Sequence, residues 1–163
     1  SLVLSPTTTQ TPAKTTNTQK VTKTTTTYHA TGPADLSVRI VAVGVIDPAT
    51  GAFIARTPTS PSDTAAVEFD IANVGYSSTG TYYFTAVLPT LSGYTYQSPA
   101  QVSLAPGDHV LNTLRFTQVA PGGGTFSVTV DPAGRVAEGS SNNNYASQFV
   151  PMPNYYTYPG YQY

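Results

Sequence analysis

The sequence contains no cysteine and no tryptophan, and charged side chains make up only 9% of its 163 residues. Without cysteine the chain has neither a disulfide framework nor a thiolate metal site. The net charge is −1, and the three lysines, Lys14, Lys20 and Lys23, all lie near the N-terminus. A nucleic-acid-binding protein needs clustered basic residues to contact phosphates, so this composition argues against nucleic acid as a partner.

Long apolar runs are also missing. No stretch approaches the ~20 consecutive apolar residues of a membrane-spanning helix, and no basic segment followed by an apolar one suggests a signal peptide. The chain starts at Ser1 rather than Met, as expected of a processed or trimmed start. It contains no Asn-x-Ser/Thr sequence, so N-glycosylation is not expected.

The residues that are present divide the chain into three parts. Residues 1–33 form an arm in which 12 of the 21 residues from 7 to 27 are Thr. Residues 34–150 have the mixed composition of a globular domain, and residues 151–163 form a tail rich in Tyr and Pro. This length gives room for one domain with a sizeable core plus appendages.

Alternating apolar and polar residues run through residues 34–150. In AAVEFDIANVG, residues 65–75, Val67, Phe69 and Ile71 alternate with polar or small residues, and this period of two indicates a half-buried strand. The same pattern predicts further strands within residues 35–47, 81–88, 109–117, 124–132 and 145–150.

Turn sequences such as LAPGD and DPAGR separate these strands, and no window has a helical period. Gly and Pro suit turns because Gly allows a positive φ and Pro presets φ near −65°. The sequence therefore predicts an all-β fold, an Ig-like antiparallel β-sandwich of about seven strands. Phe69, Phe84, Phe116 and Phe126 are predicted to pack together between the two sheets, and Asn112 is the one polar residue on an apolar face.

Several of these segments together resemble the CARDB family, Ig-like domains of secreted and surface proteins of bacteria and archaea. The resemblance covers roughly residues 34–150, and an inserted segment, residues 47–63, interrupts it after the first strand. It is carried by an N-x-G after the second strand, an L-x-P-G turn and a closing VDPxxxVxExxxxNN. In this chain these motifs are Asn73, Gly75, Leu104, Pro106, Gly107, Val130, Asp131, Pro132, Val136, Glu138, Asn143 and Asn144. The resemblance implies a fold and a cell-surface setting, and no single ligand.

Candidate catalytic residues are few. The only histidines are His29, in the arm, and His109, at the start of a predicted strand, and a catalytic triad needs a base held between an orienting group and a nucleophile. Glu68 and Asp70 share one face of a strand and are expected to be solvated rather than to form the carboxylate pair of a glycoside hydrolase. We therefore expect neither enzymatic activity nor a cofactor.

The closing motif offers the only candidate metal ligands. Asp131, Glu138 and Asn143 carry the oxygen atoms that Ca²⁺ prefers. The alternative, which we favour, is that these side chains cap and tie down the last hairpin, since Asp and Asn often bond neighbouring backbone amides.

The function is therefore sought in the arm and the tail. Tracts rich in Thr with interspersed Pro resemble O-glycosylated stalks, although such a composition also suits a plain disordered linker. The expected attachment sites are Thr7, Thr8, Thr9, Thr15, Thr16, Thr24, Thr25, Thr26 and Thr27.

An extended arm of 33 residues spans on the order of 110 Å and could pair with a sheet edge of a neighbouring copy. The Tyr-rich tail could contact a neighbour or a glycan, or simply fray. The residues predicted to mediate assembly are Leu2, Val3, Leu4, Val21, Tyr28, Tyr155, Tyr156, Tyr158 and Tyr161.

The resulting hypothesis is a non-enzymatic, extracellular structural subunit that polymerises head to tail into a surface fibre. Its partners would be copies of itself and covalent glycans. The alternative is an adhesive or carbohydrate-binding accessory domain of a larger secreted protein.

The glycosylation hypothesis predicts that native protein is heavier than its polypeptide. Thr hydroxyls in an exposed arm are free to carry sugars because no core depends on them. Intact-mass spectrometry should give several masses above the 17.1 kDa of the bare chain. A single mass equal to that of the bare chain would disprove it.

Overall fold

The computed structural model describes residues 14–24 and 31–154. Within these residues the chain forms nine strands and no helix. The described part of the chain therefore has no helix that could cross a membrane. The strands are β1 (Thr15–Thr22), β2 (Leu36–Ile46), β3 (Phe53–Ile54), β4 (Ala65–Asn73), β5 (Phe84–Val87), β6 (Thr95–Gln97), β7 (His109–Phe116), β8 (Gly124–Val130) and β9 (Tyr145–Val150).

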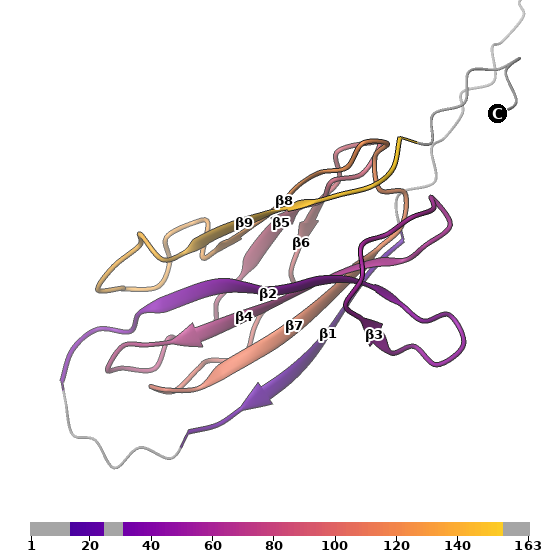
Figure 1. Ribbon diagram of the computed structural model, residues 1–163. Coiled ribbons are helices and arrows are strands. Elements are labelled where there is room, and N and C mark those ends of the chain that lie inside the picture. The colour runs from indigo at the N-terminus through magenta and orange to yellow at the C-terminus, as the bar shows by residue number, and fades with distance from the viewer. Residues whose placement is uncertain (1–13, 25–30, 155–163) are drawn as a thin grey trace, which may run out of the picture.

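The nine strands form two sheets that pack face to face (Figure 1). One sheet has the order β1-β7-β4-β2-β3 and the other has the order β6-β5-β8-β9. All strand pairs within the two sheets are antiparallel. The predicted all-β, Ig-like sandwich is confirmed.

Each of the six segments predicted as strands contains one, and β1, β3 and β6 were not predicted. β3 comes from the inserted residues 47–63 and folds back on β2, so that Val45 pairs with Ile54 and Ile46 with Phe53. The insertion therefore extends the edge of one sheet.

β1 comes from the Thr-rich arm, which was expected to lie outside the globular domain of residues 34–150. That expectation is wrong for residues 15–22, which pair with β7 from Thr15 opposite Phe116 to Thr22 opposite His109. Because β7 already pairs with β4 on its other side, β1 becomes the edge strand of the sheet.

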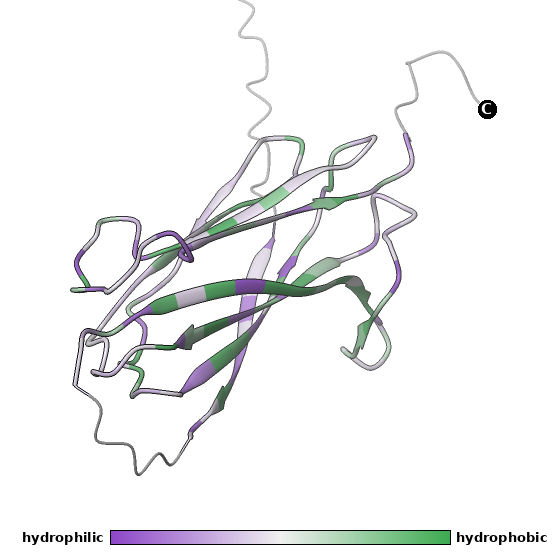
Figure 2. Ribbon diagram, turned by 60° about the vertical axis from the view of Figure 1, so that its left-hand side comes forward, coloured by the Kyte–Doolittle hydropathy of each residue, from purple (hydrophilic) through white to green (hydrophobic). Residues whose placement is uncertain are grey.

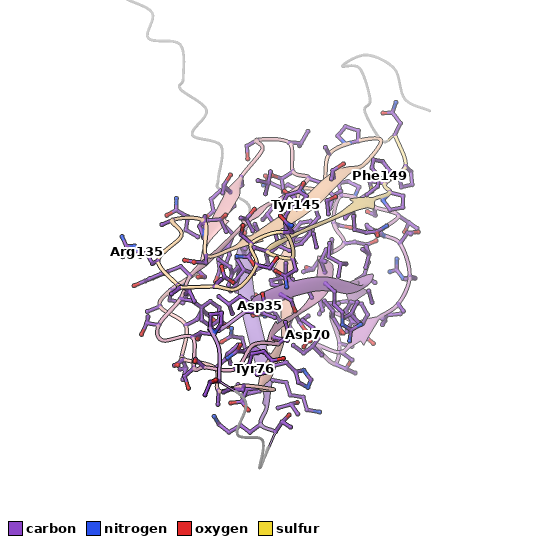
Figure 3. All side chains as sticks on the ribbon, turned by 90° about the vertical axis from the view of Figure 1, so that its left-hand side faces the viewer. Asp35, Asp70, Tyr76, Arg135, Tyr145 and Phe149 are labelled. Atoms are coloured by element: carbon purple, nitrogen blue, oxygen red, sulfur yellow. The ribbon has the colours of Figure 1, made fainter. Side chains whose placement is uncertain are left out.

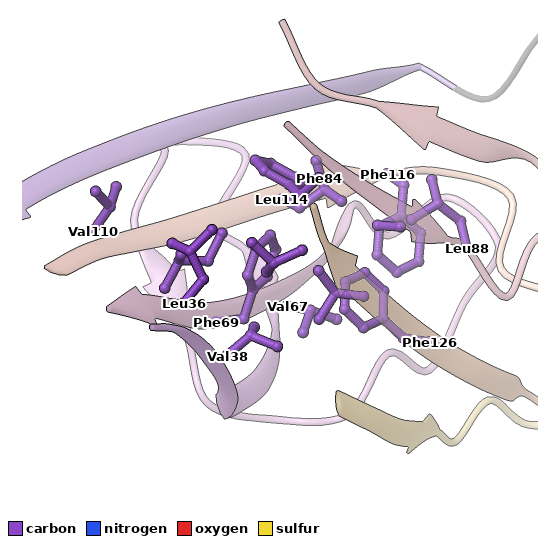
Figure 4. Close-up of a cluster of buried hydrophobic side chains, with 14 of the residues drawn as sticks. Leu36, Val38, Val67, Phe69, Phe84, Leu88, Val110, Leu114, Phe116 and Phe126 are labelled. Carbon is purple, nitrogen blue, oxygen red and sulfur yellow. The ribbon is translucent and has the colours of Figure 1, made fainter. Parts of the chain in front are cut away.

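The core lies between the sheets and is built from the apolar positions of the alternating strands (Figures 2 and 4). Phe69, Phe84, Phe116 and Phe126 are all fully buried, as predicted. The Phe69 ring lies 5.4 Å from that of Phe84, centroid to centroid, in an edge-to-face arrangement, and 5.8 Å from that of Phe126. Since Phe69 is in one sheet and the other two are in the opposite sheet, these contacts join the layers.

One strand departs from simple alternation. A bulge between Ile40 and Ala42 shifts the register of β2 against β4 and leaves Val41 45% exposed. Beyond the bulge the inward positions move to odd numbers, because the extra residue reverses the faces of the pleat. Val43 then packs against the core, where continued alternation from Leu36 would have turned it outward.

The N-x-G motif ties three loops together at one end of the sandwich. The buried Asn73 side chain accepts hydrogen bonds from the backbone amides of Asp35 and Gly75 and donates to the carbonyls of Ser77 and Leu104. A Cβ atom at position 75 would collide with the backbone of residues 33–35, so only Gly fits there.

The aromatic core predicts unequal costs for two Phe-to-Ala substitutions. Phe69→Ala should lower the free energy of unfolding by about 3–5 kcal/mol, because it removes contacts to both layers and leaves a cavity. The matched control is Phe149→Ala in β9, where the side chain is 52% exposed. Chemical denaturation measures both, and equal losses at the two positions would contradict the packing described here.

Candidate functional site

His109 and Asp70 form a pair on the outer face of the β4–β7 sheet. The imidazole Nδ1 lies 2.9 Å from Asp70 Oδ1, and the Asp70 side chain is only 11% exposed. The expectation that Asp70 is solvated is therefore wrong. No hydroxyl group bonds to this imidazole within the described residues, so the pair lacks the nucleophile of a catalytic triad. Its role is to connect the neighbouring strands β4 and β7. The other histidine, His29, lies outside the described residues.

The oxygen-rich closing motif ties the last hairpin to β2. Both carboxylate oxygens of Asp131 accept backbone amides, from Arg135 at 3.0 Å and Val136 at 2.9 Å. Glu138 accepts the Leu36 amide at 2.8 Å and the Asn144 side-chain amide at 2.6 Å. These bonds match the capping role favoured above over calcium binding. Within the described residues, no three His, Cys, Asp or Glu side chains are grouped to hold a metal ion.

Asn143 completes this tie, since its side chain donates to Asp35 at 3.0 Å and its carbonyl accepts the Val38 amide. Burial raises the pKa of Glu138, and the charges of Asp131 and Asp35 raise it further, against the opposing hydrogen bonds from Asn144 and Leu36. The carboxylates at this end therefore work as a structural clamp.

Amide side chains hold β1 against the rest of the sandwich. Asn112 in β7 is fully buried, and its Oδ1 accepts hydrogen bonds from Asn17 at 3.0 Å and Gln19 at 2.8 Å. Gln19 also donates to the side chain of Gln101. Gln101 follows β6 and pairs with Tyr82 in an isolated antiparallel bridge. This network explains the one polar residue on the apolar face of β7, because a buried amide needs partners.

The C-terminal end of β1 is held by a buried carboxylate. Asp108 accepts the backbone amides of Thr24 at 2.9 Å and Ala105 at 3.2 Å, and its carboxylate lies 3.6 Å from the Lys23 ammonium. Burial alone would raise the pKa of Asp108, but these two amides and Lys23 outweigh it and hold the pKa below its ordinary value of 3.8.

Few apolar contacts, however, attach β1 to the rest of the sandwich. Six of its eight residues are exposed, and Asn17 and Thr15 are only half-buried. The Oδ1 atom of Asn17 is buried without a hydrogen-bond partner in the described part of the chain, which is costly. The outer edge of β1 pairs with no other described strand, so from Thr16 to Thr22 the backbone N–H and C=O groups on that side are open to a further strand.

A hollow of about 190 Å³ opens beside this end of β1. Its wall is largely apolar and includes Val21 from β1, Val110 from β7 and Val102 from the segment after β6. Val102 is 81% exposed and Val21 is 53% exposed. Two exposed valines beside one hollow and one open strand edge make a candidate binding surface, which we call the β1 seat.

The structure tests only part of the predicted assembly set. Val21 was predicted to pair with a neighbouring molecule. It pairs with Val110 of its own chain on one side, and for its outer side the prediction stays a prediction. The other members lie outside the described residues: Leu2, Val3, Leu4, Tyr28, Tyr155, Tyr156, Tyr158 and Tyr161.

Three of the predicted glycosylation sites are described. Thr16 is exposed on β1 and Thr15 is half-buried. Thr24 is exposed, but its hydroxyl donates to the Gly107 carbonyl at 2.8 Å, so a sugar there would break that bond. The remaining sites, Thr7–Thr9 and Thr25–Thr27, lie outside the described residues.

Sequence reasoning missed Asn17, Gln19, Gln101 and Asp108. One signal was available, because Asn17 and Gln19 alternate with Thr and Asn112 needed polar partners once it was placed on a buried face.

The Asp108 anchor predicts a pH-dependent attachment of β1. In Asp108→Asn, one carboxylate oxygen becomes an NH₂ group that cannot accept the Ala105 amide, and the Lys23 contact is lost. The free energy of unfolding should fall by about 1–3 kcal/mol at neutral pH. A depressed pKa stabilises the fold above 3.8 and loses this effect as the pH falls through the folded value.

The difference in unfolding free energy between the native protein and Asp108→Asn should therefore shrink as the pH falls below 3.8. Hydrogen exchange should show the largest acceleration in the variant at the backbone amides of β1. Glu68→Gln is the control, because that half-buried carboxylate lies mid-strand, away from the β1 anchor. A difference that does not change with pH would show that Asp108 acts through shape and not through its charge.

Comparison with known proteins finds a matching family and solved structures with a similar fold. The CARDB family model matches residues 51–148, which is more than half of the chain. The CARDB domain of a Pyrococcus furiosus protein, in a crystal structure described as a complex with di-metal ions, is 22% identical with a TM-score of 0.58, and the match covers 76% of this chain and 97% of that one. The solution structure of that domain, also 22% identical, has a TM-score of 0.54 and covers 76% and 98%.

A Methanosarcina acetivorans domain, from a protein provisionally named a cell surface protein, is 18% identical with a TM-score of 0.49, and the match covers 78% of this chain and 98% of that one. No curated protein matches the chain. The resemblance predicted from the N-x-G, L-x-P-G and closing motifs is confirmed, and the chain belongs to the CARDB family.

Proposed function

We propose that the chain is a non-enzymatic structural subunit at the cell surface, which polymerises head to tail into a fibre through its N-terminal arm. The observation that carries the proposal is the β1 seat, where an open strand edge meets an apolar hollow with two exposed valines. CARDB is a family of non-catalytic, Ig-like domains, and domains of this kind usually act through their surfaces.

The first residues of a neighbouring copy have the chemistry that the β1 seat needs. Leu2 and Leu4 alternate with Ser and Val in SLVLS, and residues 5–20 contain no other Leu, Val, Ile or aromatic residue. An extended segment of this kind can pair with the open edge of β1 while its alternate side chains enter the hollow. Burying the exposed valines and the two leucines would supply the apolar contact that β1 lacks.

Geometry favours filling the seat from another copy. The chain enters β1 at Thr15, whereas the hollow lies at the opposite end of the strand, beside Val21 and Lys23. Thr15 is eleven positions along the chain from Leu4, a reach of about 36 Å when extended. Filling its own hollow would require the arm to reverse direction, and filling a neighbour's would not. A donor segment and an acceptor on different parts of one subunit generate an open polymer.

Glycosylation of the arm is compatible with this arrangement. Thr16 lies on the exposed face of β1, and Thr7–Thr9 lie between the donor segment and β1. Sugars on these residues would extend the arm and cover the polar strand without occupying the hollow.

The proposal predicts that donor and acceptor can be disabled separately. Deleting residues 1–13 removes the donor segment and leaves β1 intact, while Val102→Asp places a charge where apolar side chains are to be buried. Each variant alone should remain monomeric under conditions in which the native protein forms fibres. Leu2→Asp with Leu4→Asp should behave like the deletion. Leu91→Asp, at an exposed leucine in a turn after β5, is the control and should polymerise normally.

Mixing the two disabled proteins gives the decisive measurement. The deletion variant can only accept an arm and the Val102→Asp variant can only donate one, so an equal mixture should form dimers and nothing longer. Analytical ultracentrifugation and negative-stain microscopy follow both states. Fibres from the deletion variant, or a mixture that stays monomeric, would contradict the proposed contact.

A further inference from the structure

A second hollow, of about 330 Å³, is lined by residues of the β5–β6 edge and by none of the residues that line the β1 seat. It is lined by Thr85 of β5, Gln97 of β6, Tyr83 and the turn of residues 131–135. Figure 3 shows Arg135 projecting from this turn at the surface of the molecule. The volume falls at the lower end of the range of small-ligand sites, about 300–1,000 Å³.

Polar groups without partners converge on this hollow. Elsewhere the buried amides of Asn73 and Asn112 are bonded within the chain. The side chains of Thr85, Gln97 and Arg135 make no such bond within the described residues, and Tyr83 is 39% exposed. Few polar groups around one aromatic ring are typical of a site that orients a small polar ligand.

The strands of the sheet beside the hollow carry no charged residue. The sequences of β5, β6, β8 and β9 contain no Asp, Glu, Lys or Arg. Their register aligns Gln97, Thr85, Thr129 and Tyr145 in one row across the outer face. Tyr145 is 57% exposed on β9 (Figure 3), so the row runs from the hollow over hydroxyl groups to a second aromatic ring.

The outer face of the other sheet is different. Each of its four longer strands carries a charged residue on this face: Lys20 in β1, Arg115 in β7, Glu68 in β4 and Arg39 in β2. Within the described residues, the charges carried by strands therefore all belong to one sheet. Arg135 is the one cation that lines the hollow beside the other sheet.

We propose that this hollow binds a carboxylate-bearing sugar, as one unit of an acidic glycan. The ring of Tyr83 packs against the apolar face of the sugar, as aromatic side chains with one polar end do at wet binding surfaces. Thr85 and Gln97 exchange hydrogen bonds with its hydroxyl groups. The Arg135 guanidinium pairs with its carboxylate, for which its planar fork of donors is suited.

Asp131 also lines the hollow, and its role is to position Arg135. Its two oxygens are occupied by the backbone amides of Arg135 and Val136, and its own backbone is left-handed, with a φ of 52°. The carboxylate therefore holds the turn in shape and presents the guanidinium outward. This site is separate from the β1 seat, so it stands or falls independently of the proposed fibre.

The test is an NMR titration of the full chain, labelled with ¹⁵N, with a trimer of galacturonic acid. The neutral trimer of galactose is the matched ligand without carboxylates. The acidic trimer should shift the amide signals of Tyr83, Thr85, Gln97 and Arg135, and the neutral trimer should bind at least about tenfold more weakly.

Two variants and a control complete the test. Arg135→Gln should weaken binding of the acidic trimer at least about tenfold and leave the spectrum folded, since the side chain is exposed. Tyr83→Ala should also weaken binding. Arg39→Gln, at an exposed arginine on the other sheet, should change nothing. Absence of shifts, equal binding of the two trimers, or unchanged binding by Arg135→Gln would each overturn the proposal.

Discussion

The contact of Phe69 with Phe84 and Phe126 is the interaction on which the rest of the structure depends. It joins the two sheets at their centre, with ring centroids 5.4 and 5.8 Å apart. Sheets that bury one face can leave edges and outer faces free for other uses. Both candidate sites lie in such places: the β1 seat at a sheet edge, and the Arg135 hollow at the end of an outer face.

Polar ties at the ends of the sandwich give these sites their shape. Asn73 bonds to backbone groups of four residues in three segments, and Glu138 connects the start of β2 with Asn144, the residue before β9. Each side chain takes the place of water as the hydrogen-bond partner of backbone groups that burial would otherwise leave unpaired. The family motifs are thus structural. The residues proposed to bind partners, Val102 and Arg135, lie next to these ties and carry no structural bond of their own through their side chains within the described residues.

The stability of the molecule is unevenly distributed, and the proposed assembly uses its least stable part. The strands around Phe69 bury large apolar side chains, whereas β1 is held by amides, one carboxylate and a largely exposed valine. A strand with few buried apolar contacts opens more readily than the core. In the proposed fibre, an incoming apolar segment would therefore stabilise the edge where the subunit itself is weakest, and the contact would leave the buried core between the sheets untouched.

The alternation of residues and the turn sequences determined the sandwich, six of its strands, the buried Phe cluster and the family, because a period of two and a turn are local properties of the chain. The sequence also placed Asn112 on an apolar face without explaining it. Only the tertiary structure decided that Asn17, 95 residues away, and Gln19, 93 residues away, are its partners, which makes part of the arm a strand. The bulge in β2 and both hollows were equally hidden, since they arise where segments distant in sequence pack together, and no local pattern records which polar groups meet there.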